Sequence, residues 1–63
     1  MTQKELLYVE DAISHEDIII LNIKDYINCL EESDFIDFYQ KELKKHEKIK
    51  NELFKLLESE SYE

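Results

Sequence analysis

Apolar residues recur at alternating spacings of three and four along two long stretches of this 63-residue chain, and no glycine or proline interrupts either stretch. Such spacing is typical of a helix that buries one stripe of its surface. The first stripe consists of Leu6, Val9, Ile13, Glu16, Ile20, Ile23, Ile27 and Leu30. The second consists of Phe35, Tyr39, Glu42, His46, Ile49, Leu53 and Leu56. The pattern predicts an all-α protein with two long helices.

A short polar segment, residues 31–34, separates the two stripes. We expect helices at about residues 4–31 and 34–58, a turn at 32–33 and a frayed polar tail at 59–63. Ser33 is the expected N-cap of the second helix, because its hydroxyl can accept a hydrogen bond from a backbone N–H of the first turn. A link of so few residues makes the helices antiparallel neighbours. The predicted fold is one antiparallel two-helix hairpin spanning residues 1–63.

Both stripes are wider than a two-helix hairpin can cover. They are broadened by Ala12, Ile19 and Tyr26 in the first helix, and by Ile36, Phe38, Leu43 and Leu57 in the second. A chain shorter than about 70 residues usually needs a disulfide, a metal or a partner to complete its core. We therefore expect a two-fold symmetric homodimer, in which two hairpins form a four-helix bundle. The expected dimer core is Ile13, Ile20, Ile23, Ile27, Tyr39, Ile49, Leu53 and Leu56.

Charge and composition argue against several classes of protein. The chain has 16 acidic and 8 basic residues, a net charge of −8, which argues against a nucleic-acid partner. Without glycine there is no phosphate-binding loop, and the single Cys29 excludes an intrachain disulfide. No apolar run approaches the ~20 residues of a membrane helix, and no secretory signal pattern is present. We expect a cytoplasmic protein with no membrane partner, no cofactor and no enzymatic activity.

Three polar residues interrupt the stripes near the middle of both helices: Glu16 in the first, and Glu42 and His46 in the second. An antiparallel hairpin brings them within about one helical turn of one another. One interpretation is a buried hydrogen-bonded network that fixes register. Another is a site for Fe, Mn or Zn that uses these residues from both chains, although the four-residue step from Glu42 to His46 is one longer than the Glu-x-x-His of di-iron bundles. In the third, the bundle splays and these residues reach water.

Most of the lysines gather in the second helix, as Lys41, Lys44, Lys45, Lys48 and Lys50. They form either a docking patch for an acidic partner or a solvated face beside the acidic first helix, with Lys48 and Glu52 as an i,i+4 pair. We favour the solvated face. Ile18 and Leu21 are expected to point away from the stripe, as a small outer apolar patch.

Two segments carry a family resemblance: LYVEDAISHE at residues 7–16 and QKELKKHEKIKNEL at residues 40–53. Their most distinctive elements are the His-Glu pairs His15-Glu16 and His46-Glu47. Over residues 5–57 the chain resembles the spore coat protein F-like family of spore-forming Firmicutes. The resemblance implies a ferritin-like helical bundle, here completed by dimerisation. It also implies a structural role in assembly, with incorporation into the spore coat and other coat proteins as further partners.

Overall fold

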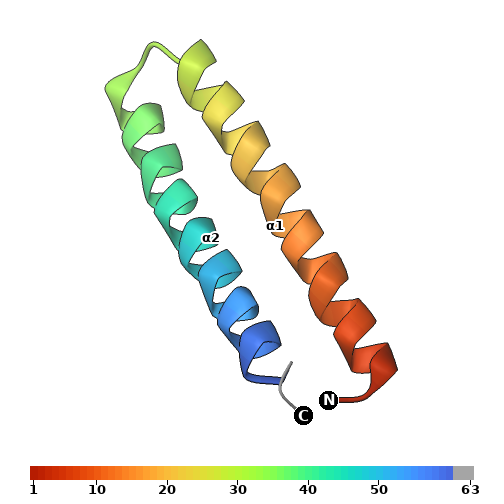
Figure 1. The fold of residues 1–63 in the computed structure, drawn as a ribbon. Helices are drawn as coiled ribbons and strands as arrows, with labels where there is room; N and C mark the ends of the chain where they lie inside the picture. Colours follow the sequence, from red (N-terminus) through yellow and green to blue (C-terminus); the bar gives the residue numbers. More distant parts are fainter. Residues whose placement is uncertain (61–63) are drawn as a thin grey trace.

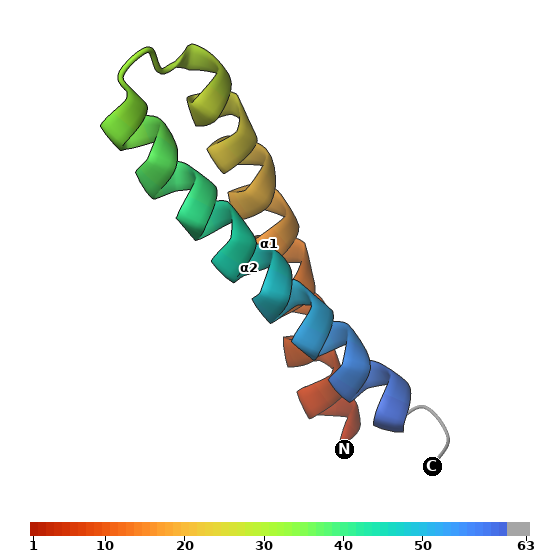
Figure 2. The ribbon, with the colours of Figure 1, turned by 90° about the vertical axis from the view of Figure 1, so that its left-hand side faces the viewer.

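The structure, a computed structural model, describes residues 1–60. It contains two helices, α1 (Gln3–Cys29) and α2 (Ser33–Glu60), which lie side by side and antiparallel (Figures 1 and 2). The beginning of α1 and the end of α2 lie at the same end of the hairpin (Figure 1). The molecule measures 48 × 15 × 11 Å, so the two helices form a single layer that is one helix thick. The predicted all-α hairpin is therefore confirmed for the described residues.

Helix α1 begins with a capping box that fixes its first turn. The Thr2 hydroxyl accepts a hydrogen bond from the Glu5 N–H at 3.1 Å, and the Glu5 carboxylate accepts one from the Thr2 N–H at 2.8 Å. These bonds satisfy backbone donors that have no partner within the helix. The helix ends at Cys29, after which Leu30 is extended (φ −85°, ψ 143°) and its N–H donates to the Tyr26 carbonyl. No residue of positive φ is required, so the turn forms without glycine.

The turn comprises residues 30–32 rather than the predicted 32–33. The Ile36 N–H donates to the Glu32 carbonyl at 3.1 Å, so Glu32, not Ser33, accepts the first hydrogen bond of α2. Ser33 is the first helical residue, and its assignment as the N-cap was wrong by one position. Helix α2 also continues through Ser59 and Glu60, two residues beyond its predicted end. The rest of the expected tail, residues 61–63, lies outside the described residues.

The interior of the hairpin is small. Among the residues whose side chains are described, the buried hydrophobic ones are Ile13, Ile20 and Ile23, all from α1. These three members of the expected dimer core are covered by the chain's own second helix. Ile27, Tyr39, Ile49 and Leu53 are half-buried, and Leu56 is exposed. Much of each stripe therefore stays accessible to solvent in a single hairpin.

An ion pair and a pair of tyrosine rings link α1 to α2, on different sides of the hairpin. Lys50 of α2 forms an ion pair with Asp17 of α1, and its ammonium lies 5.8 Å from the centre of the Phe54 ring. Near the turn, the Tyr26 and Tyr39 rings are 5.6 Å apart and tilted by 57°. The Phe38 ring meets Tyr39 edge-on at 5.2 Å. These three rings therefore pack α1 against α2 at the end of the hairpin near the turn.

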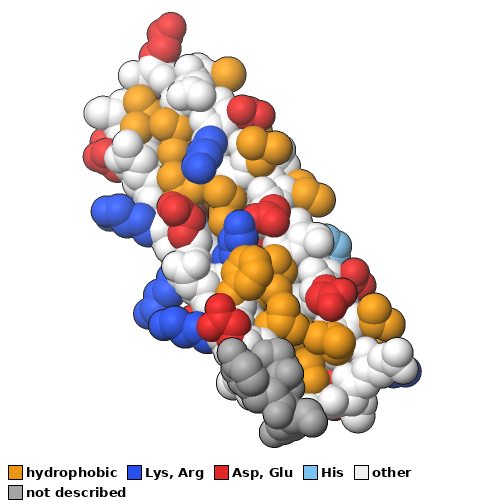
Figure 3. Space-filling view, viewed as in Figure 1, with side chains coloured by type: hydrophobic (Ala, Val, Ile, Leu, Met, Phe, Trp, Pro, Cys, Tyr) orange, Lys and Arg blue, Asp and Glu red, His pale blue; other side chains and the backbone are white. Residues whose placement is uncertain are grey.

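The surface carries the pattern expected of a short amphipathic hairpin. On the face shown in Figure 3, hydrophobic side chains follow the groove between the helices, and lysines gather along α2. Ile18 and Leu21 are exposed, as expected for the outer side of α1. Neither α1 nor α2, as far as they are described, combines the length and apolar character needed to cross a membrane.

Candidate functional site

The structure brings the three polar residues of the stripes together. Glu16 lies on α1, thirty residues before His46 on α2, and the His46 Nδ1 is 2.6 Å from the Glu16 Oε2. A carboxylate oxygen only accepts hydrogen bonds, so Nδ1 donates in this contact. This contact joins the helices at mid-length and orients the imidazole ring. It has the geometry of the hydrogen-bonded network considered from the sequence.

Glu42 flanks the other ring nitrogen. Its Oε2 lies 3.7 Å from the His46 Nε2, which is longer than a hydrogen bond but within ion-pair range. The exposed side-chain fractions are 14% for Glu16, 18% for His46 and 31% for Glu42. The cluster is therefore sheltered on the Glu16 side and opens toward solvent on the Glu42 side. We call Glu16, Glu42 and His46 the polar cluster.

Within one chain, the polar cluster does not form a complete metal site. Among the side chains that the structure describes, those of residues 1–59, no three or more His, Cys, Asp or Glu stand in a group that could hold a metal ion. The His46 Nδ1 is hydrogen-bonded to the Glu16 carboxylate, so this nitrogen is not free to bind a metal ion. Only the His46 Nε2 and the Glu42 carboxylate point toward a shared position from which an ion could bind both.

An exposed apolar surface lies beside the polar cluster. We call it the open face, and it consists of Tyr8, Ile19, Tyr26, Phe38 and Leu56. On α1 its members are eleven and seven residues apart, close to three and two turns, and on α2 they are eighteen apart, which is five turns. The contacts of Tyr26 and Phe38 with the Tyr39 ring show that the two rows lie on the same side of the hairpin.

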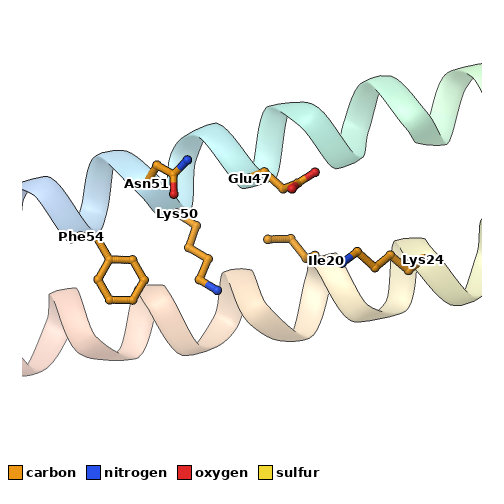
Figure 4. A pocket seen from close by; sticks show the side chains of 6 residues that line it. All are labelled: Ile20, Lys24, Glu47, Lys50, Asn51 and Phe54. Carbon is orange, nitrogen blue, oxygen red and sulfur yellow. The ribbon is translucent and has the colours of Figure 1, made fainter.

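The opposite side carries the ion pair, and we call it the bridged face: Asp17, Lys50 and Phe54. At 100° per residue, Asp17 is about 160° from Ile19 around α1, and Phe54 is about 160° from Phe38 around α2. A pocket of about 270 Å³ lies on this side, lined by Ile20, Lys24, Glu47, Lys50, Asn51 and Phe54. Lys50 and Phe54 project from α2 toward α1 across it (Figure 4). Its mixed charges do not indicate one class of ligand.

The remaining candidates from the sequence occupy separate positions. Cys29 is an exposed free thiol at the end of α1. In the lysine group, Lys50 pairs with Asp17 across the helices, and Lys41, Lys44, Lys45 and Lys48 are exposed. Sequence reasoning assigned no role to Tyr8, which the structure places on the open face. Its spacing of eleven residues from Ile19 was the available signal.

Comparisons of the chain with protein-family models, with curated proteins and with solved structures gave no match. The resemblance to the spore coat protein F-like family therefore stays a prediction from residues 7–16 and 40–53.

Proposed function

We propose that this chain is a non-enzymatic assembly protein that acts as a homodimer, in which two hairpins pack through their open faces into a four-helix bundle. The exposure of large side chains on the open face carries this conclusion. Tyr8, Tyr26 and Phe38 are 61%, 50% and 55% exposed. Of the eleven large hydrophobic residues that are exposed within the described part of the chain, five lie on the open face. An exposed apolar surface of this kind is typical of a site that a partner covers.

The size of this surface suits a stable dimer. The side of the hairpin that shows both helices measures 48 by 15 Å. A partner that covered this whole side would meet an outline of roughly 700 Å², which is of the same order as the ~800 Å² that each partner contributes to a standard interface. Dimerisation would also supply the hydrophobic burial that three buried isoleucines per chain leave incomplete.

The arrangement of the open face favours a second copy of the chain over an unrelated partner. Four of its five residues lie toward the two ends, Tyr26 and Phe38 near the turn and Tyr8 and Leu56 near the opposite end, whereas Ile19 lies near mid-length. The polar cluster lies between them. A two-fold axis that lies in the interface plane and crosses its middle places apolar ends against apolar ends and the polar cluster against its own equivalent. Another protein would have to offer polar groups at the same level.

The biological setting is a further part of the proposal and rests on the family resemblance. In this part of the proposal, the dimer is a building unit of a spore coat and contacts other coat proteins. The outer patch, Ile18 and Leu21, is then a second contact surface, because it stays exposed on the side of α1 away from α2.

Two neighbouring isoleucines provide a matched test of the dimer. Ile19 belongs to the open face, whereas Ile18 lies on the outer side of α1, and both are exposed. In EDTA, sedimentation equilibrium of the wild type should give twice the chain mass of 7.7 kDa. Ile19→Lys should weaken association at least tenfold, and Ile18→Lys should leave it within a factor of about two. A wild-type chain that stays folded and monomeric at high concentration contradicts the proposal, as does equal weakening by both variants.

A further inference from the structure

We infer that the dimer binds one zinc ion at the centre of its interface, through the His46 Nε2 and the Glu42 carboxylate of each copy, an inference that rests on the homodimer proposed above. Glu16 is then a positioning residue rather than a ligand. One chain contributes two of the four ligands, so the site is incomplete without the second copy.

The Glu16–His46 hydrogen bond prepares the histidine for metal binding. With the proton on Nδ1, at 2.6 Å from the Glu16 Oε2, the lone pair of a neutral ring is on Nε2. Histidine ligands of metals commonly donate their other N–H to a carboxylate, which sets the tautomer and the ring orientation. Glu16 and His46 form this carboxylate–histidine pair before any ion is present, and both are mostly sheltered from solvent.

The separation of the two proposed ligand atoms fits a tetrahedral ion. The His46 Nε2 and the Glu42 Oε2 are 3.7 Å apart. Ligand atoms about 2.1 Å from zinc lie about 3.4 Å apart in a tetrahedron, so a small side-chain rotation brings both into range. Their spacing of four residues on one helix directs both side chains to the same side.

Two-fold symmetry completes the coordination sphere. His46 and Glu42 lie at mid-length on α2, between the open-face residues Phe38 and Leu56. A two-fold axis that lies in the interface plane at this level therefore brings the two His46–Glu42 pairs together and supplies two nitrogens and two oxygens. The cation would also neutralise the two Glu42 carboxylates, which otherwise approach each other at the interface. Two nitrogens and two oxygens in a tetrahedron suit zinc, whereas magnesium requires an octahedron of oxygens.

The test is a zinc titration of the EDTA-stripped full-length chain after removal of the chelator, followed by calorimetry, with sedimentation measured in parallel. We expect half an equivalent of zinc per chain. His46→Ala and Glu42→Gln should each weaken binding at least 100-fold, and Glu16→Gln should weaken it about 10- to 100-fold. Glu47→Gln is the matched control, because Glu47 is an exposed carboxylate of α2 that lines the pocket on the bridged face, and it should change zinc affinity less than twofold.

Cobalt(II) in place of zinc adds a readout of geometry, because a tetrahedral site gives strong visible absorption that an octahedral site lacks. A dimer that binds no zinc, or binds zinc equally well in His46→Ala, overturns this inference and leaves the homodimer standing. One zinc per chain also overturns it, because the shared site requires one per dimer. A folded monomer overturns the homodimer together with the shared site.

Discussion

The open face and the bridged face belong to the same two helices, yet they meet solvent in different ways. On the bridged face, Lys50 reaches across to Asp17 and lies over the Phe54 ring, so an ion pair crosses the apolar groove. On the open face, Tyr26 and Phe38 extend outward and are about half exposed. The bridged face is therefore suited to water, and the open face to a partner. The two sides of the hairpin look equivalent in the sequence pattern, but an ion pair crosses one side and exposed aromatic rings lie on the other.

The largest loss of stability is expected from a substitution in the interior of the hairpin rather than on either face. Ile20→Asp places a carboxylate in the buried centre of the hairpin, which costs several kcal/mol and should abolish folding. Leu21→Asp changes the next residue, which is 62% exposed, and should shift the free energy of unfolding by about 0.5 kcal/mol or less. Far-ultraviolet circular dichroism of the two variants checks this pair. A folded Ile20→Asp variant would show that the isoleucine core is dispensable.

The second effect compares the two faces directly through one phenylalanine on each. Phe38→Ala should lower the free energy of dimer unfolding by about 2–4 kcal/mol, because each dimer loses two side chains from its interface. Phe54→Ala should lower it by about 1–2 kcal/mol, since it removes a partly exposed ring and its contact with Lys50 from each copy. Urea denaturation at a fixed chain concentration measures both losses. Equal losses would remove the distinction between the faces.

A smaller effect distinguishes the two carboxylates of the polar cluster. In EDTA, Glu16→Gln should lower the free energy of unfolding by about 1–2 kcal/mol, because it weakens a mostly sheltered, charge-assisted hydrogen bond. Glu42→Gln should cost about 0.5 kcal/mol or less, since its oxygen is 3.7 Å from the ring and more exposed. Long-range ¹H–¹⁵N NMR of the wild type should place the proton on the His46 Nδ1. A proton found only on Nε2 would contradict the assigned hydrogen bond.

The smallest effects belong to the lysines. Asp17 is 54% exposed in its ion pair with Lys50, so a double-mutant cycle of Asp17→Asn and Lys50→Gln should give a coupling energy of about 0.5 kcal/mol or less, falling with added salt. Lys44→Gln together with Lys48→Gln should change the free energy of unfolding by about 0.5 kcal/mol or less. A larger loss from this pair would mean that the lysine group has a partner on the first helix.

Much of the fold could be predicted because helical periodicity is a local property. The steps of three and four identified both helices, and the short link between them implied their antiparallel arrangement. The same periodicity placed Glu16 and His46 at one level, where the structure joins them. The polar cluster was therefore readable from residue spacing and the direction of the two helices.

Other features depend on three-dimensional detail that spacing does not contain. Periodicity shows which residues share a stripe on one side of a helix. The rotation of each helix about its own axis decides which residues of that stripe the other helix covers and which remain exposed. Ile20 is consequently buried while Leu56, also in a predicted stripe, is exposed. The choice between Glu32 and Ser33 as the N-cap of α2 depends on which carbonyl accepts the first backbone hydrogen bond of the helix, and this is the carbonyl of Glu32. The partner of Lys50 is Asp17, and the distance in sequence hides this contact until the helices are packed.

Isotope-filtered NOE spectroscopy on a dimer refolded from labelled and unlabelled chains tests the central claim most directly, because it detects only contacts between copies. If two copies pack through their open faces, as proposed, intermolecular NOEs should come from Tyr8, Ile19, Tyr26 and Phe38, and none from Leu21 or Phe54. Intermolecular NOEs confined to Leu21 or Phe54, or a folded chain with no intermolecular NOEs at millimolar concentration, would contradict the account.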